Sequence, residues 1–493
     1  MMSAAETASI PEWLLGRSRQ KSRLAVAAVL IGLAISIVML ASPNALQGLG
    51  IILGMIAAVA ALLWPQLAVY ALAADIIATW PQSAPKYIGV LLVLAMTWRI
   101  LTGYARPRKD KILLVMIAFT VLAWISMILS PTKQDITTTA VTYSSFVVMY
   151  WAFITLLSSE KLIRNTIVFL VLAGLGAALI GLAQMFLHFT LPTSLYQQVE
   201  ALGEMTLVDA QGFMGRLRVD SVAAQPVLFA FSLQTVAPFV ILPLVSAWRT
   251  RNQLLFLALL VCLMTMAAAW TQTYARTSYV AVAVMLIWGA SKYGRRAVVT
   301  VVVAAALLAG PLLLVSEPIR DRFVSVFTGA EEAGAYMSSV EWRLGMWQVG
   351  LQMVADHPLT GVGPGQFMYN FKQYLPNYQL MPPGYEVISP LHNTFLATTV
   401  DLGLLGLALF VVMLWLTMRT LWRAQRELRA NDRHTMADMA MAVEVAMVGL
   451  LVSMLFADLE RFRYVWFLIA LAGAIGGVAT TGARNRTTAQ EGT

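Results

Sequence analysis

His392 is the residue of this 493-residue chain best suited to acid–base chemistry, and Asn393 follows it directly. The chain has only four histidines, and an imidazole titrates close enough to neutral pH to take a proton from an attacking hydroxyl. The amide of Asn393 could orient a substrate oxygen. A purely structural interpretation also fits, in which the histidine caps a helix that begins near Thr394 at a membrane interface.

Four arginines could bind an anionic group. Arg276 lies in a short segment between two apolar runs, Arg216 and Arg218 are close neighbours ahead of Asp220, and Arg343 lies on a helix-like stretch. A guanidinium is always charged and holds phosphate oxygens through two parallel hydrogen bonds. The structural alternatives are snorkelling to lipid phosphates for Arg276, neutralisation of one of the pair by Asp220, and an ordinary solvated helix face for Arg343.

Motifs for a resident metal or cofactor are not recognisable in the sequence. The acidic pair Glu331-Glu332 has no companion at metal-ligand spacing, and the glycine-rich run 361–365 matches neither common phosphate-loop pattern. We therefore expect a structural turn at 361–365, no metal and no cofactor. Zinc-finger spacing and a basic ribbon with stacked aromatic residues are also missing, which argues against a nucleic acid partner. The single cysteine, Cys262, is expected to be a buried apolar residue.

The composition identifies the solvent that surrounds these residues. Apolar residues make up 59% of the chain and charged residues 12%, whereas globular proteins average about 25% charged. Runs long enough to cross a bilayer predict an all-α polytopic membrane protein with about fourteen transmembrane helices. The transmembrane domain is predicted at 24–481, between cytoplasmic tails at 1–23 and 482–493. Asp75 and Glu444 fall within these apolar runs, so each is either functional or paired with a basic residue.

The basic residues predict the orientation of the chain. With the N-terminus inside, 23 of the 34 lysines and arginines fall on the cytoplasmic side, which agrees with the positive-inside rule and places both termini in the cytoplasm. Segment 316–394 then becomes one long external loop. It contains an apolar periodicity over 342–353 that predicts an amphipathic helix lying on the membrane face. The four arginines and His392 are all external, and most of the remaining cations are explained by orientation.

The spacing after His392 resembles the signature of bacterial O-antigen ligases and their polymerase relatives. Nine residues separate Asn393 from Gly403, and Gly406 follows three residues later. Residues 356–367 resemble the same family's periplasmic loop, and the ligase-like core is expected at about 205–420. Asp401 stands where the family usually has glutamate. We expected Gly403 and Gly406 to let a neighbouring helix approach closely.

The resemblance implies a GT-C-like, metal-independent glycosyltransferase of the bacterial inner membrane, with its active site on the periplasmic face. Such an enzyme moves a glycan from undecaprenyl diphosphate to lipid A core or to a growing polysaccharide. His392 would be the base, and Arg276 with Arg218, or less favourably Arg216, would match the family's arginines. Asn393 and Arg343 complete the predicted substrate-binding set.

Two alternatives stay open at this point. A polymerase of O-antigen or exopolysaccharide shares the donor chemistry and differs in its acceptor. A transporter or flippase for a lipid-linked or anionic solute would also need external arginines, although transporters usually bind their cargo near the midplane of the membrane on broken helices.

Overall fold

The computed structural model describes residues 60, 64–77, 84–101, 103, 105–130, 136–187, 219, 221–223, 225–315, 320, 339–374 and 390–490. All regular structure in this part of the chain is helical, as predicted. The helices are α3 (Pro65–Asp75), α4 (Ala84–Leu101), α5 (Lys111–Leu129), α6 (Ile136–Leu156), α7 (Glu160–Leu187), η1 (Ser221–Ala223), α10 (Pro226–Arg249), α11 (Gln253–Thr271), α12 (Arg276–Ser291), α13 (Arg295–Val315), α15 (Ser339–Asp356), α16 (Phe367–Tyr374), α17 (Thr394–Ala430), α18 (His434–Ser453) and α19 (Arg463–Gln490).

Eight of the described helices are long and apolar enough to cross a membrane. They are α5, α6, α7, α10, α11, α17, α18 and α19, and their membrane-spanning parts all lie within the transmembrane domain predicted at 24–481. Helix α11 exposes large apolar side chains on the surface of the protein: Leu254, Val261 and Met264 are 82%, 64% and 61% exposed. Such a surface is costly in water and favourable in lipid. Residues 24–59, where the predicted transmembrane domain begins, lie outside the described residues, and the total of fourteen spans stays a prediction.

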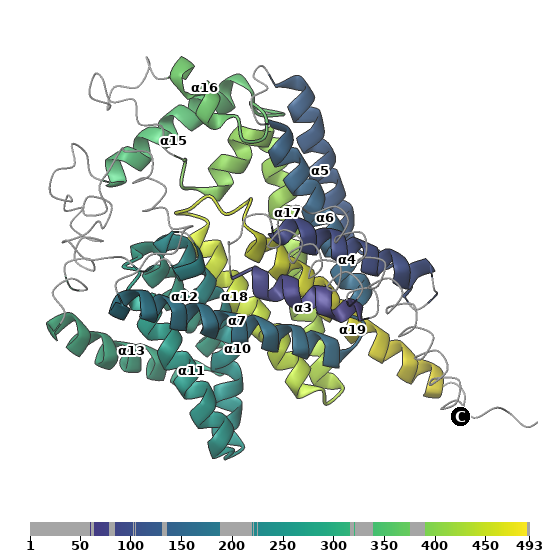
Figure 1. Cartoon of the computed structure of the whole chain (residues 1–493), viewed down its shortest axis with the longest axis vertical. Coiled ribbons are helices and arrows are strands. Elements are labelled where there is room, and N and C mark those ends of the chain that lie inside the picture. The colour runs from purple at the N-terminus through teal and green to yellow at the C-terminus, as the bar shows by residue number, and fades with distance from the viewer. Residues whose placement is uncertain are drawn as a thin grey trace, which may run out of the picture.

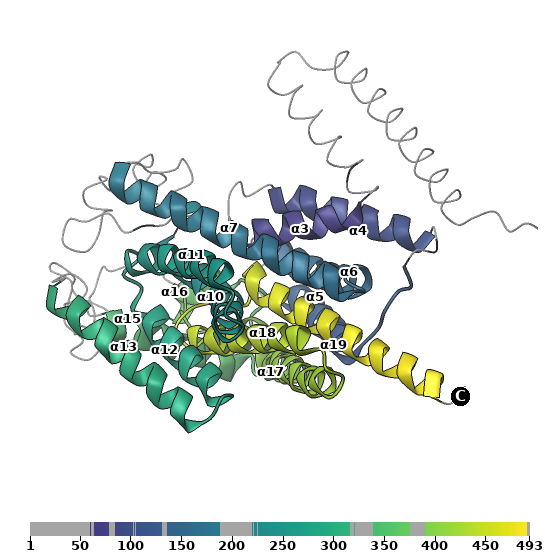
Figure 2. The same ribbon diagram turned by 90° about the horizontal axis from the view of Figure 1, so that it is seen from below.

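Helices α17, α18 and α19 form the centre of the bundle and contact one another. Helices α5 and α6 flank them on one side, and α10 and α12 pack against α18 on the other, with α11 against α10 and α7. Seen from below, α3 and α4 lie along one side of the molecule, with α3 against α7, and α12, α13 and α17 lie toward the opposite side (Figure 2). The short helices α15 and α16 sit together at one end, beside α17 (Figure 1).

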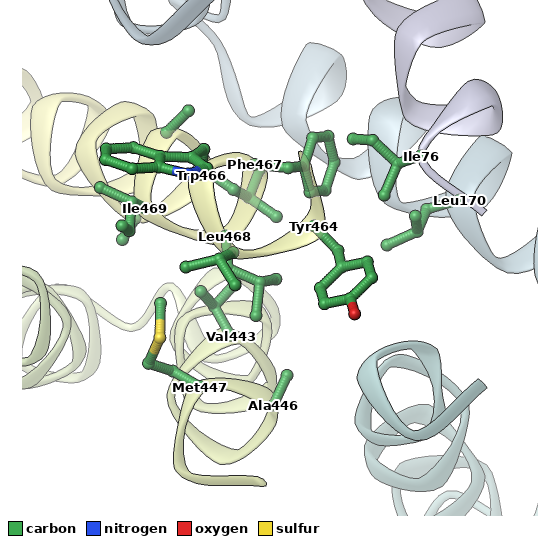
Figure 3. Close-up of a cluster of buried hydrophobic side chains, with 14 of the residues drawn as sticks. Ile76, Leu170, Val443, Ala446, Met447, Tyr464, Trp466, Phe467, Leu468 and Ile469 are labelled. Carbon is green, nitrogen blue, oxygen red and sulfur yellow. The ribbon is translucent and has the colours of Figure 1, made fainter. Parts of the chain in front are cut away.

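A cluster of buried side chains lies where the first turns of α19 meet α18. Trp466, Phe467 and Leu468 are at most 1% exposed, and Val443 and Met447 of α18 lie close below them (Figure 3). Aromatic stacking extends this core, because the ring of Phe146 in α6 lies 4.9 Å from that of Trp466. Cys262 is also buried, as expected. This rigid core holds the segment between α18 and α19, which shapes the candidate site.

Candidate active site

The start of α17 is tied to the segment that follows α18. Asn393 is the N-cap, and its Oδ1 accepts the N–H groups of Phe395 and Leu396 at 3.1 Å each. The helix begins at Thr394 as predicted, but Asn393 rather than His392 caps it. The hydroxyl of Thr394 donates to the carbonyl of Ala457 at 2.6 Å and accepts the N–H of Leu459 at 2.8 Å. These bonds fix the position of the two residues that precede the helix.

Asp458 holds the backbone of His392 in a left-handed conformation. The N–H of His392 donates to Asp458 Oδ2 at 3.0 Å, and the N–H of Asn393 donates to Oδ1 at 2.9 Å. His392 has a φ of 53°, a backbone conformation that few residues other than glycine adopt without an energetic cost. Two hydrogen bonds to one carboxylate offset that cost. Burial raises the pKa of Asp458, and the two N–H donors oppose this rise.

The His392 side chain is half-buried beside a positive charge. Burial and, secondly, the nearby Arg343 guanidinium lower its pKa to about 4. The imidazole is therefore neutral at pH 7 and has a lone pair that can accept a proton. Arg343 is itself half-buried on α15, and its charge acts on both His392 and Asp458. Arg343 belongs to the predicted substrate-binding set, and its half-buried position near His392 does not fit the alternative of an ordinary solvated helix face.

Packing against protein positions α15 at this site. The indole of Trp347 donates to the carbonyl of Leu391 at 2.7 Å, one residue before His392. The apolar stripe of the helix, Met346, Val349 and Met353, is fully buried in a cluster with residues of α16 and the first turns of α17. The expectation that this stripe rests on the membrane face was wrong. Periodicity revealed the apolar face correctly, but it does not identify what covers that face.

The glycine-rich turn fills a break in α17. Gly403 has a φ of 68° and a ψ of −171° inside the helix, so the helical hydrogen bonds stop there. The turn replaces them: Val362 N–H donates to Val400 O at 2.8 Å and Gly363 N–H to Asp401 O at 3.1 Å. Leu404 N–H donates back to Pro358 O at 2.8 Å. A turn, and not the helix we expected, therefore packs on Gly403.

Side chains from α5 and α17 secure the same turn. Ser126 donates to the carbonyl of Thr360 at 2.6 Å, and Ser130 donates to that of Val362 at 2.6 Å. Asp401 is 2% exposed and accepts the N–H of Gly365 through Oδ2 at 2.9 Å. Asp401 thus faces the interior of the bundle. The turn at 361–365 is structural, and it supports the helix that carries Asn393.

Arg276 is the first residue of α12 and lies at the same end of the bundle as His392. Ser278, two residues later, donates to Gln234 Oε1 at 3.0 Å, and Gln234 Nε2 donates to Ser453 at 3.1 Å. The next residue after Ser453, Met454, accepts the N–H of Thr394 at 2.8 Å. This buried chain of hydrogen bonds links the start of α12 to the start of α17 through the end of α18.

Arg216 and Arg218 lie outside the described residues. The structure does describe Val219, which is fully buried and donates its N–H to the carbonyl of Gln272 at 3.2 Å. Gln272 belongs to the tight turn that precedes Arg276. The chain that leads into the first residues of α10 therefore passes beside the Arg276 turn.

Three charged residues between α18 and α19 were not predicted from the sequence to be site residues. Besides Asp458, they are Glu460, which is fully buried, and Arg461, whose Nε donates to Glu460 Oε1 at 3.1 Å. Burial raises the pKa of Glu460, and the Arg461 charge opposes the rise. A visible signal was available, because the run 458–463 places four charges between two apolar spans. Among the described residues, no three His, Cys, Asp or Glu side chains are grouped as metal ligands.

The two acids within apolar runs are paired. Asp75 bonds to Arg463, and Glu444 bonds to Lys292 Nζ at 2.6 Å. Glu444 also accepts hydrogen bonds from the side chains of Trp288, Trp422 and Gln425. The pairing interpretation of both acids is thus confirmed.

Residues 259–411 match a family model described as O-antigen ligase. The match covers about a third of the chain and includes Arg276, Arg343, His392 and the break at Gly403. The predicted relationship to O-antigen ligases and polymerases is confirmed, and it rests on the segment that builds the site described above. No curated protein matches the sequence.

Proposed function

Because residues 259–411 match a family model described as O-antigen ligase, we propose that this chain transfers a glycan from undecaprenyl diphosphate to an acceptor hydroxyl. The observation that carries the proposal is the environment of His392. Its backbone is held by Asp458, its imidazole is neutral at pH 7, and the Arg343 charge lies beside it. A base next to a cation suits a reaction that removes a proton and releases an anionic leaving group.

His392 takes the proton from the acceptor hydroxyl as its oxygen attacks the anomeric carbon of the donor sugar. The bond from that carbon to the diphosphate oxygen breaks, and undecaprenyl diphosphate leaves with the electron pair. Asn393 Oδ1 caps α17, so its amide Nδ2 is the group that binds the acceptor oxygen. Preorganised donors at such positions act without reorganisation cost during the reaction.

Arginines neutralise the departing diphosphate in this proposal. Arg343 is the described arginine whose charge lowers the pKa of His392. Arg276 begins α12 at the same end of the bundle. Arg218 and Arg216 complete the set, since the next described residue, Val219, bonds to the turn before Arg276. In this proposal the guanidinium groups carry out the charge neutralisation, and the transfer proceeds without a metal.

Donor binding would also activate the base. In the free protein the Arg343 charge contributes to the low pKa of His392. A diphosphate bound to Arg343 offsets that charge, so the pKa of His392 rises when the donor is in place. The imidazole then becomes a stronger base only in the complex that is ready to react.

The proposed setting is the bacterial inner membrane, with a GT-C-like arrangement of about fourteen spans, both termini in the cytoplasm and the active site on the periplasmic face. The charge distribution of the loops supports this orientation. A periplasmic site also suits the donor, because an activated sugar reaches that face attached to lipid. The transporter alternative is less favoured, since the candidate residues gather at one end of the bundle and not at its middle.

A transfer assay with the purified full-length chain tests the proposal. The assay supplies an undecaprenyl-diphosphate-linked glycan with either lipid A core or a second lipid-linked glycan as acceptor. His392→Ala should lower the transfer rate by roughly 10²–10⁴-fold. His434→Ala is the matched control, because His434 is exposed at the start of α18, and it should retain the wild-type rate.

The products separate the two acceptor classes. Attachment to lipid A core identifies a ligase, and elongation of the lipid-linked glycan identifies a polymerase. Full activity of His392→Ala with both acceptors would contradict the role of the base. Movement of the donor lipid across a liposome bilayer, without any transfer, would instead establish the transporter alternative.

A further inference from the structure

A basic cavity lies at the end of the bundle opposite to His392. Its volume is about 340 Å³, within the range of small-molecule sites. Its walls come from the segment before α5, the second half of α17 and the later turns of α19. Five cationic side chains line it: Arg108, Lys109, Lys111, Arg419 and Arg423.

Helix α5 shows that this cavity and the candidate active site are separate. Lys111, at its N-terminal end, lines the cavity, and Ser126 and Ser130, at its C-terminal end, bond to the glycine-rich turn. Nineteen helical residues rise roughly 28 Å, about the thickness of a hydrocarbon core. The cavity therefore faces the side of the membrane that the charge distribution assigns to the cytoplasm.

The cations that line the cavity outnumber its carboxylates. Two carboxylates also line the cavity, Asp110 and Glu427. Asp110 is already engaged, because its Oδ1 accepts the N–H of Leu113 at 2.8 Å and its Oδ2 accepts the hydroxyl of Tyr150 at 2.6 Å. Within the described residues, none of the five cations forms an ion pair. The lining thus carries an excess of positive charge that an anion can compensate.

The cavity is also shaped by its backbone. The Arg108 guanidinium occupies the space where a side chain on Gly477 would stand, and Thr420 lies against Gly476 in the same way. Arg108 Nη1 additionally donates to the carbonyl of Ile154 at 3.3 Å. One guanidinium is thereby held in place at the wall, next to the hydroxyl-bearing side chains of Thr420 and Thr480. The positive-inside rule explains basic loops, but it does not require them to close around a preformed cavity.

We propose that this cavity is a second site, which binds a phosphate-bearing anion from the cytoplasmic side. Phosphate groups fit because guanidinium and ammonium groups bind them in numbers, and three arginines line one cavity here. The headgroup of an anionic phospholipid and a soluble phosphate compound share this chemistry. The proposal does not depend on the glycan transfer proposed above.

The test uses the full-length protein in phosphatidylcholine nanodiscs and has two arms. One arm measures retention of added phosphatidylglycerol by native mass spectrometry, and the other measures binding of inorganic pyrophosphate by calorimetry. The cavity variant combines Lys109→Gln, Arg419→Gln and Arg423→Gln. The control variant combines Arg164→Gln, Arg295→Gln and Arg296→Gln, which also removes three charges but at exposed positions outside the cavity.

The wild type should bind in at least one arm, and the cavity variant should bind at least about tenfold more weakly. The control variant should stay within about twofold of the wild type. Binding of the lipid alone identifies a headgroup site, and binding of pyrophosphate identifies a site for soluble phosphates. Equal losses in the two variants, or no binding by the wild type in either arm, would overturn the proposal. If the triple variant does not fold, Arg423→Gln alone is compared with Arg295→Gln by the same criteria.

Discussion

Asp458 is the residue on which the geometry of the proposed base depends. Its carboxylate accepts the two consecutive N–H groups of His392 and Asn393, so one side chain fixes both the left-handed backbone and the N-cap of α17. Asp458 touches neither the donor nor the acceptor in the proposed reaction. It acts by position, and its contribution should appear in the rate and not in substrate binding.

Asp458→Asn tests this role. The amide keeps one acceptor oxygen but replaces the other by an N–H donor, which repels one of the two backbone N–H groups. We expect kcat to fall by about 10–100-fold, because a displacement near 1 Å is sufficient for such a loss, while KM stays unchanged. Circular dichroism should show an intact helical fold. An unchanged kcat would mean that the carboxylate does not position the base.

The pKa of His392 predicts the pH dependence of transfer. Because the base acts in its neutral form and its pKa is lowered to about 4, kcat/KM of the free protein should stay level from pH 7 downward and fall only near pH 4. Arg343→Gln removes one of the two causes of the low pKa, so the fall should move to higher pH, toward 6.5. A pH–rate profile of both proteins measures this shift. A profile that Arg343→Gln leaves unmoved would contradict the proposed proximity.

Some site residues could be predicted from the sequence and others could not, for physical reasons. His392 and Arg276 stood out because each is a polar residue at the end of an apolar run, where the membrane makes such a position unusual. Asp458 is 66 residues downstream of His392, and the contact exists only after α17 and α18 have packed side by side. Local spacing contains no information on that packing.

At the scale of elements, α17 is two helices joined across a break. The break at Gly403 frees the carbonyls of Val400 and Asp401, and the turn at 358–363 supplies N–H groups to them. Both glycine-containing segments are recognisable in the sequence, but as two separate features. Their connection through backbone hydrogen bonds was not predictable, because a glycine alone does not reveal whether it allows a close approach, a positive φ, or both.

Gly403→Ala should be strongly destabilising. A Cβ at this position would collide with the backbone of Leu359 and Thr360, and a φ of 68° is itself unfavourable for alanine. Together we expect a loss of about 2–4 kcal/mol, seen as a lower unfolding temperature in detergent. Gly176→Ala is the matched control, because a Cβ there meets no atom within 4 Å. Equal unfolding temperatures for the two variants would contradict the described packing.

At the scale of the whole molecule, the two ends of the bundle carry different chemistry. One end holds His392, Arg343 and the charged segment that follows α18, and the other holds the basic cavity. The hydropathy of the sequence predicted the described spans well, since burial in lipid depends on composition alone. The distribution of lysines and arginines predicted which end of the bundle faces the cytoplasm, and that orientation is open to direct measurement.

Single cysteines can report the orientation. In a Cys262→Ser background, which removes the one native thiol, Lys372→Cys places a thiol on α16 and Ser291→Cys places one at the end of α12. Both native residues are exposed. A membrane-impermeant maleimide should label the Lys372→Cys protein in intact spheroplasts, and the Ser291→Cys protein only after permeabilisation. The reverse pattern would invert the topology.

The hydrogen bonds between residues 358–363 and the break in α17 have a consequence for engineering. The two segments lie about forty residues apart, yet each supplies the hydrogen-bond partners that the other lacks. A chimaera that exchanges residues 316–394 alone would join a foreign turn to a native break. Specificity grafts between relatives should therefore transplant 356–406 as one cassette.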